Sequence, residues 1–288
     1  MDLENRYGNR DVQQKLLEIL IYFKAFCDEH QLRFTLAGGT LLGAVRNRGF
    51  IPWDDDVDVF MLREDYEKLE LLWDLYADTS RYSCVRSNEK VNIHHAATEI
   101  KDNNTTFINR HSINDDIHHG LMIDVIPLDD VPENGLLRMM QSMYALVFCC
   151  FNFQRLPEHK GKLTYRMTKI ALRMVQSPKT RYLIWKCSEQ RMMKIGKKSS
   201  GEVASLVEGM KILKERFPRE WFEQPVYLMF EGMEMPAPQQ YKRWLEVSYG
   251  DYMTPVPDED RVPRHNIVFL DMNHSYKDYK GIYYCVKE

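Results

Sequence analysis

Three aspartates at alternating positions, Asp54, Asp56 and Asp58, are the residues whose type and spacing most directly suggest chemistry. Side chains at i and i+2 of an extended strand point the same way, about 6.5–7 Å apart. A strand that began at Asp54 would therefore present all three carboxylates on one face, with Asp55 on the other. Clustered carboxylates repel one another and need a compensating cation, and Mg²⁺ prefers such oxygen ligands together with substrate phosphates. The spacing predicts a Mg²⁺ (or Mn²⁺) site.

Two other interpretations of this acidic cluster were open from the residues alone. The first, an acidic turn in solvent, requires no ligand and is common. The second, an EF-hand calcium loop counted from Asp54, requires glycine at its sixth position and a bidentate glutamate at its twelfth. Val59 and Asp65 occupy those positions, so the calcium loop is excluded.

A glycine turn upstream favours the metal site over the acidic turn. Gly38, Gly39 and Thr40 lie between an apolar strand and a helical segment, where backbone N–H groups and a helix N-terminus can hold phosphate. A Gly-Gly pair alone is often only a tight turn. Followed closely by clustered carboxylates, it indicates phosphate capture beside a metal, the pairing on which phosphoryl transfer depends.

Asp124 is a further acidic candidate, because it interrupts the apolar stretch MIDVIPL, where an uncompensated carboxylate would be costly. It could complete the site as a metal ligand or general base, or it could cap a loop or pair with an arginine. Arg46, Arg48 and Lys101 could contact phosphate, or pair with nearby acids. Further candidates for substrate contact or packing are Trp53, His118, His119, Arg264 and His265.

The elements that must position these residues alternate between strand and helix, which predicts an α+β (α/β-like) domain. Apolar periodicity predicts helices over 12–27, 41–45, 64–76 and 239–249, strands over 34–37, 57–61, 97–101 and 121–126, and a hairpin of 226–230 with 233–235. The prolines Pro157 and Pro178 also predict breaks in the helical pattern of 136–198.

Composition agrees with an ordinary globular protein. The 288 residues are 44% hydrophobic and 28% charged, which excludes a disordered, collagen-like or disulfide-stapled chain. Six cysteines without a CxxC pair predict reduced thiols. The polar start lacks a secretory signal, and the longest uncharged run, 139–154, has 16 residues, short of the roughly 20 that span a bilayer. We expect a cytoplasmic protein, soluble or peripheral on a membrane.

Charge is segregated along the chain. Residues 136–198 contain 14 Lys or Arg and two acids, a net charge of +12, while the whole chain carries −3. Methionines and aromatic residues are interspersed with these cations, a pattern typical of helices that bind anionic membranes. A solvated face over a methionine-rich core is the alternative, and no nucleic-acid-binding module accompanies the charge.

We expect a catalytic core over 1–134, a basic amphipathic helical insertion over 135–200, and a C-terminal part over 201–288 that returns to the core.

The segment from Gly39 to Leu69 closely resembles the LicD family, whose members carry a GTLLGAxRxxGFIPWDDDxDxxMxRxDYE-like stretch. Further blocks at 101–105, 120–129, 249–253 and 264–265 also resemble the family, whereas 136–198 does so only thinly. The resemblance implies a nucleotidyltransferase-fold mixed sheet flanked by helices, with the basic helices as an insertion.

The resemblance also implies a set of site residues. Asp56, Asp58 and Asp124 would be catalytic, and Asp54 would join them in binding Mg²⁺ or Mn²⁺. For the nucleotide donor, the resemblance implies contacts with Gly38, Gly39 and Thr40, to which the candidates Arg46, Lys101 and His265 are added as expected contacts.

The function implied is a metal-dependent transfer of a phospho-alcohol such as phosphocholine. The donor would be CDP-linked, and the acceptor a hydroxyl of a cell-surface glycan (lipopolysaccharide or teichoic acid) or its lipid-linked precursor. The enzyme would work in the cytoplasm, on the inner face of the cytoplasmic membrane where it is peripheral, without a nucleic-acid partner. The alternatives are a true nucleotidyltransferase that releases pyrophosphate, and an inactive membrane-bound scaffold.

Overall fold

The computed structural model describes residues 8–156, 162–197, 199–208, 215–263 and 265–286. The chain forms two compact units. The first contains residues 1–85, 99–126 and 220–288, and the second contains 86–98 and 127–219. The insertion predicted over 135–200 lies inside the second unit, which also includes flanking segments on both sides.

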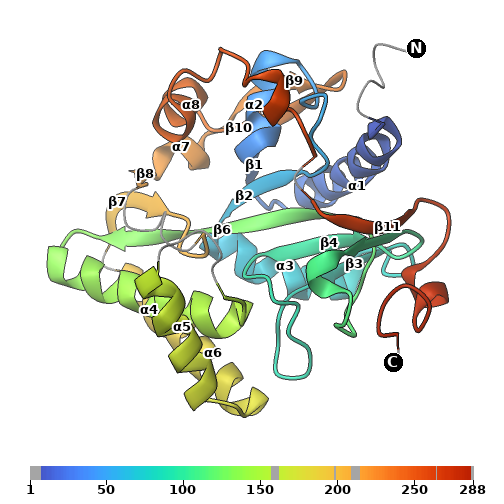
Figure 1. Cartoon of the computed structure of the whole chain (residues 1–288). Coiled ribbons are helices and arrows are strands. Elements are labelled where there is room, and N and C mark those ends of the chain that lie inside the picture. Colours follow the sequence, from blue (N-terminus) through green and yellow to red (C-terminus); the bar gives the residue numbers. More distant parts are fainter. Residues whose placement is uncertain (1–7, 157–161, 198, 209–214, 264, 287–288) are drawn as a thin grey trace. The chain divides into compact units, whose positions relative to one another are not determined.

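A mixed β-sheet forms the centre of the first unit, with the strand order β1-β2-β6-β4-β3 (Figure 1). β1 pairs with β2 and β3 pairs with β4, both antiparallel. A separate antiparallel pair joins β5 (Thr106–Asn109) to β11 (Ile267–Asp271). The bounds of the five central strands are β1 Phe34–Leu36, β2 Asp58–Leu62, β3 Tyr82–Val85, β4 Thr98–Asp102 and β6 Met122–Pro132.

Helices of the first unit bury apolar stripes that the sequence periodicity predicts. Along α1, Leu16, Leu20 and Phe23 are fully buried, and each such side chain contributes about 1.5–3 kcal/mol by leaving water. Trp73 of α3 packs in the same core and donates from Nε1 to the carbonyl of Tyr82 at 3.1 Å. The remaining elements are the β9–β10 hairpin and two later helices. The bounds of the helices and the hairpin of this unit are α1 Arg10–Glu29, α2 Gly38–Arg46, α3 Arg63–Tyr76, α7 Glu220–Glu223, β9 Val226–Phe230, β10 Met233–Ala237 and α8 Tyr241–Tyr249.

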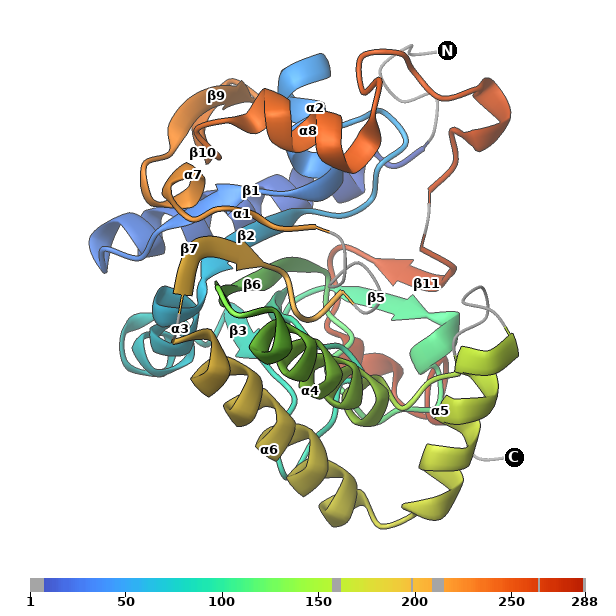
Figure 2. The same ribbon diagram turned by 90° about the vertical axis from the view of Figure 1, so that its left-hand side faces the viewer.

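The second unit combines three helices with a small antiparallel sheet. Residues 129–132 of β6 pair with β7 (Ser199–Ala204), which pairs in turn with β8 (Phe217–Pro218). The helices α4 and α6 lie side by side (Figure 2), joined by the edge-to-face contact of Phe148 with Trp185. The helix bounds are α4 Gly135–Phe153, α5 Lys162–Met174 and α6 Pro178–Gly196.

Arg181 ties the three helices of this unit together. Its guanidinium donates to the carbonyl of Leu172, within the last turn of α5, at 2.8 Å and to that of Val175, just beyond the helix, at 2.7 Å. It also donates to Oε1 of Gln154, the C-cap of α4, at 2.7 Å. Pro178 is the first residue of α6, where its missing N–H leaves no hydrogen bond unmade. The break predicted at Pro178 matches the start of α6, and Pro157 lies outside the described residues.

Within the part of the chain that the structure describes, α4 is long and apolar enough to cross a membrane by length and composition. Its most apolar window has a mean hydropathy of 1.3, and 33% of that window is buried. Core helices of soluble proteins meet the same criterion, so α4 alone is weak evidence for a membrane span.

The structure confirms the α+β fold class and the predicted helices and strands of the first unit. Their ends shift by at most three residues, except that β6 runs to Pro132, six residues beyond its predicted end. Five strands had not been predicted: β3, β5, β7, β8 and β11. Each is short and pairs with a partner distant in sequence or is rich in polar residues, so local periodicity did not mark it.

Candidate active site

The aspartates lie in a loop that leads into β2, because β2 begins only at Asp58. The strand predicted over 57–61 is thus confirmed, and the aspartates do not share a strand face, as they would if the strand had begun at Asp54. One carboxylate oxygen from each of Asp54, Asp55 and Asp56 lies within 4.8 Å of the others. The side-chain amide of Gln13 donates to the carbonyls of Ile51 and Asp54, at 3.1 and 2.9 Å. These bonds satisfy the loop backbone in place of a strand partner.

The glycine turn forms the first turn of α2 and lies directly against the carboxylates of Asp54 and Asp58. Gly38 has φ +51, a left-handed conformation that favours glycine. A Cβ at Gly38 would lie 2.6 Å from Oδ2 of Asp58, and a Cβ at Gly39 would lie 2.6 Å from Oδ2 of Asp54. The helix N-terminus carries a partial positive charge that stabilises nearby anions. Only glycines allow the backbone to approach both carboxylates so closely.

Thr40, in the first turn of α2, holds the start of β2 from a buried position. Its Oγ1 accepts a hydrogen bond from the backbone N–H of Asp58 at 2.9 Å. Thr40 therefore fixes the backbone of Asp58, and its predicted contact with the donor phosphate stays a prediction.

Asp124 and Glu99 bring a second pair of carboxylates from neighbouring strands. Asp124 on β6 donates its N–H to the carbonyl of Val57 at 2.8 Å, which fixes it beside the aspartate loop. Ligand oxygens of Glu99 and Asp124 lie within 4.8 Å of each other. Lys101 is buried, with Nζ 2.9 Å from Oε2 of Glu99. The ammonium therefore offsets the negative charge of this group.

Sequence reasoning missed Glu99. The available signal was its position two residues before Lys101 in the predicted strand 97–101, which places both on one face. What the sequence did not reveal is that β4 lies next to β6, the strand that carries Asp124.

His265 reaches the site from the C-terminal region and contacts Asp55. Its Nδ1 donates to Oδ1 of Asp55 at 3.0 Å, and Asp55 is only 3% exposed. Among the described residues, the other oxygen of Asp55 has no hydrogen-bond partner. Burial alone would lower the pKa of His265, but the hydrogen bond to Asp55 and the charges of Asp55, Asp56 and Asp124 raise this pKa to about 9.

The raised pKa of His265 predicts a pH-dependent contribution to stability in the metal-free protein. Since the folded pKa exceeds the unfolded value of about 6.5, protonated His265 stabilises the fold fully below pH 6.5. That stabilisation is lost as pH rises through about 9. We expect His265→Gln to cost about 1.5–3 kcal/mol at pH 6, and much less at pH 9.5. Urea unfolding of both proteins in EDTA measures the difference, and a pH-independent gap would contradict it.

Arg46 lies at the C-terminal end of α2 and donates from Nη1 to the carbonyl of Tyr252 at 3.5 Å. The loop that follows it is held by Glu231, the first residue of the β9–β10 turn. Oε1 of Glu231 accepts from the N–H of Phe50 at 3.1 Å, and Oε2 pairs with Arg10 at 2.8 Å. These bonds fix the segment that leads from α2 to the aspartates.

The rings of His118 and His119 are both held by hydrogen bonds to neighbouring residues. The N–H of Gly120 donates to Nδ1 of His118 at 3.0 Å, and Nε2 of His118 lies 2.7 Å from Oδ1 of Asn103. Burial, reinforced by Lys101, lowers the pKa of His118 to about 3. His119 is hydrogen-bonded to the carbonyl of Asp115. Both rings are thus neutral and engaged near neutral pH, while Arg264 lies outside the described residues.

The residues present fit a hard divalent cation. The donor set is made of carboxylate oxygens, which Mg²⁺ and Mn²⁺ prefer. The glycine cradle at α2 allows close approach, and the buried oxygen of Asp55 lacks a hydrogen bond from the described residues. Asp54, Asp55 and Asp56 offer ligand atoms close enough to share one ion.

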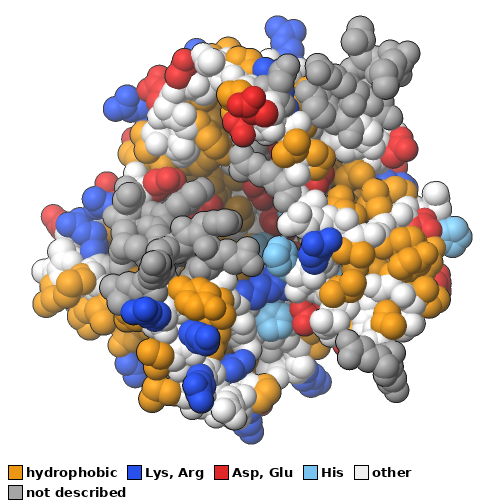
Figure 3. Space-filling model, viewed as in Figure 1, with side chains coloured by type: hydrophobic (Ala, Val, Ile, Leu, Met, Phe, Trp, Pro, Cys, Tyr) orange, Lys and Arg blue, Asp and Glu red, His pale blue; other side chains and the backbone are white. Residues whose placement is uncertain are grey.

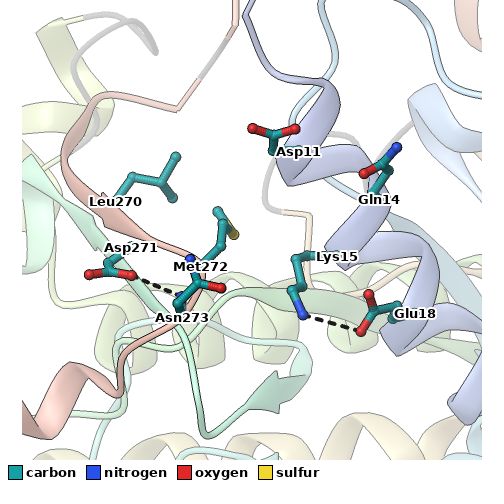
Figure 4. Close-up of a pocket in the computed structure, with 8 residues that line it drawn as sticks. All are labelled: Asp11, Gln14, Lys15, Glu18, Leu270, Asp271, Met272 and Asn273. Atoms are coloured by element: carbon teal, nitrogen blue, oxygen red, sulfur yellow. Dashed lines mark hydrogen bonds and ion pairs between the residues drawn. The ribbon is translucent and has the colours of Figure 1, made fainter.

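An open pocket of about 440 Å³ lies elsewhere in the first unit, between α1 and the end of β11 (Figure 4). Its lining mixes both charges, with Lys15 3.3 Å from Glu18. The described residues that line it include none of the predicted site residues.

Residues 31–137 match the family model described as LicD/FKTN/FKRP, nucleotidyltransferase domain. This span contains the glycine turn, the aspartate loop, Glu99, Lys101 and Asp124. The resemblance of this span to the LicD family is thus confirmed.

Among curated proteins, the chain is 28% identical over 270 residues to the lipopolysaccharide cholinephosphotransferase LicD of Haemophilus influenzae. The match covers 89% of this chain and 95% of that protein. A shorter match, to an uncharacterized protein of Rickettsia prowazekii, is 46% identical over 37 residues. It covers 13% of this chain and 14% of that protein.

Proposed function

We propose that this protein transfers phosphocholine, or a similar phospho-alcohol, from a CDP-linked donor to a hydroxyl of a cell-surface glycan. Lipopolysaccharide is the acceptor class in the name of the Haemophilus relative, which aligns with nearly the whole chain. The observation that carries the proposal is the contact of the glycine turn with Asp54 and Asp58. A helix N-terminus for phosphate and oxygen ligands for a cation meet there, as phosphoryl transfer requires.

The proposed reaction is a displacement at the phosphorus atom that bears the alcohol. The acceptor oxygen forms a bond to this phosphorus, the bond to the bridging oxygen breaks, and CMP leaves with that oxygen. Backbone N–H groups of Gly38 and Gly39 hold the donor phosphates, and Asp124 accepts the proton of the acceptor hydroxyl or helps to bind the cation. The predicted ligands Asp54, Asp56, Asp58 and Asp124, together with Asp55 of the same loop, would hold Mg²⁺ or Mn²⁺, which would supply charge that neutralises the phosphates.

Thr40 and His265 position this machinery. Thr40 fixes the start of β2, and His265 holds Asp55 in the loop. Lys101 offsets the charge of Glu99, which limits repulsion near Asp124. The protein's own residues thus orient the carboxylates before substrate arrives.

A panel of CDP-alcohols, incubated with lipopolysaccharide acceptors and Mg²⁺, tests the proposal. We expect CMP to be released in amounts equal to the phospho-alcohol found on the acceptor, and EDTA to stop both. Pyrophosphate released from a nucleoside triphosphate would favour the nucleotidyltransferase instead. Absence of any Mg²⁺–nucleotide binding by calorimetry would favour the inactive scaffold.

We further propose that the protein works at the cytoplasmic face of a membrane, held there by α4 and α5. Hydrophobic and basic side chains lie next to one another over these helices (Figure 3). The exposed apolar residues on α4 are Leu136, Met139, Met140, Met143 and Val147, and those on α5 are Tyr165, Met167, Ile170 and Met174, beside exposed Arg166, Lys169 and Arg173. Such a surface suits insertion between anionic headgroups.

Flotation with vesicles that contain anionic lipid tests this attachment. We expect the double variant Met139→Glu/Met143→Glu to lose most of the vesicle-bound fraction seen with the native protein at low salt. Leu71→Glu/Leu75→Glu on α3 is the matched control, because those side chains are at least as exposed, at 65% and 62%. Equal binding by the two double variants, or no binding of the native protein, would refute the attachment.

A further inference from the structure

Two arginines from distant parts of the sequence lie over the ring of Trp53. The guanidinium carbon of Arg46 is 5.9 Å from the ring centroid, and that of Arg261 is 5.5 Å from it. Both distances fall within the range of cation–π attraction. Trp53 immediately precedes the three aspartates, so the two cations are placed at the entrance to the aspartate loop.

The two cations influence each other. Burial first and the neighbouring charge of Arg261 second lower the pKa of Arg46, while Asp54 opposes the shift. Holding like charges close together is unfavourable unless an anion compensates them. Asp54 supplies part of that compensation, but it also faces the glycine turn.

The backbone holds both side chains in place. Arg46 donates to the carbonyl of Tyr252, and Nε of Arg261 donates to the carbonyl of Val256 at 2.9 Å. These bonds hold the guanidinium groups in place before a ligand arrives, so the arginine side chains lose little entropy when an anion binds. The planar guanidinium matches phosphate oxygens in two-point hydrogen bonds, which lysine does not offer.

We propose that Arg46 and Arg261, supported by Trp53, bind the phosphate group that remains with the nucleoside of the donor. This site rests on the proposed transfer reaction and adds Arg261, which had not been considered as a site residue. When the bond to the bridging oxygen breaks, negative charge develops on the leaving CMP, and two fixed cations beside the aspartate loop stabilise it. A single arginine would suffice to cover the indole, so packing does not account for the pair.

Calorimetric titration with CMP in EDTA tests the site without metal or turnover. We expect Arg261→Gln to weaken CMP binding at least tenfold and Arg261→Lys to restore part of it, while inorganic phosphate competes with CMP. Arg243→Gln on α8 is the matched control, because this exposed arginine forms a surface ion pair with Glu246 of the same helix, away from the aspartate loop. Its CMP affinity should equal that of the native protein.

The outcomes separate this site from the proposed reaction. Equal CMP affinity in the native protein and Arg261→Gln, at unchanged thermal stability, would overturn the site even if CDP-alcohol turnover is normal. CMP binding that depends on Arg261, without any transfer, would uphold the site and overturn the reaction. If Arg261→Gln fails to fold, Arg46→Gln and Trp53→Phe provide the same comparison. Unchanged CMP affinity in both would also overturn the site.

Discussion

Replacing Asp58 by asparagine should lower the rate of phospho-alcohol transfer by at least about a thousandfold, equivalent to about 4 kcal/mol of transition-state stabilisation. Asp58 begins β2, and its carboxylate lies against Gly38 at the N-terminus of α2. The amide of asparagine keeps the size of the side chain but removes the negative charge that a divalent cation requires. The loss should appear in steady-state transfer of phosphocholine at saturating Mg²⁺.

The same substitution should leave the fold intact. Removing one charge from a crowded group of carboxylates relieves repulsion, which offsets the lost attraction to the helix N-terminus. We expect the free energy of unfolding to change by less than about 1 kcal/mol. Asp74→Asn, on the exposed side of α3, is the matched control and should be fully active. Transfer at the native rate by Asp58→Asn would remove Asp58 from the mechanism.

Replacing Gly39 by alanine should lower transfer about a hundredfold. The new methyl group would lie 2.6 Å from Oδ2 of Asp54, closer than non-bonded atoms tolerate. Either the carboxylate or the first turn of α2 must move, and a shift of about 1 Å in a reacting group costs this much rate. Gly39 is not in the left-handed region, so the substitution adds no backbone strain.

A matched substitution isolates this contact from the general effect of alanine at a helix start. Gly135 is the first residue of α4, and a Cβ there would meet only the end of the Arg138 side chain, at 3.7 Å. Gly135→Ala should therefore keep full activity. Differential scanning calorimetry should find both variants folded. A Gly39→Ala enzyme as active as Gly135→Ala would show that the close approach to Asp54 is unimportant.

Much of this fold could be predicted from local patterns. Alternating apolar residues after Asp56 predicted β2, and helical periodicity predicted α1, α3 and the helices of the second unit. The hairpin of β9 and β10 followed from the Glu231-Gly232 pair between apolar runs, since φ is positive at both residues. These patterns depend only on residues close together in the sequence, so they can be recognised without knowledge of the fold.

Other parts of the site depend on pairings that no local pattern encodes. β11 pairs with β5, a strand about 160 residues earlier in the sequence, and His265 just before β11 contacts Asp55. Glu99 becomes a neighbour of Asp124 only because β4 and β6 are adjacent in the sheet. The aspartates themselves were found, but the loop conformation that gathers Asp54, Asp55 and Asp56 depends on Gln13 of α1.

The most direct test of the proposed reaction follows the two phosphorus atoms of CDP-choline separately. One preparation carries ³²P in the phosphate next to choline and the other in the phosphate next to cytidine, and each is incubated with protein, Mg²⁺ and lipopolysaccharide. We predict that label next to choline moves to the acceptor while label next to cytidine is released as CMP. Transfer of the cytidine-side label to the acceptor, or of neither label, would contradict phospho-alcohol transfer by this protein.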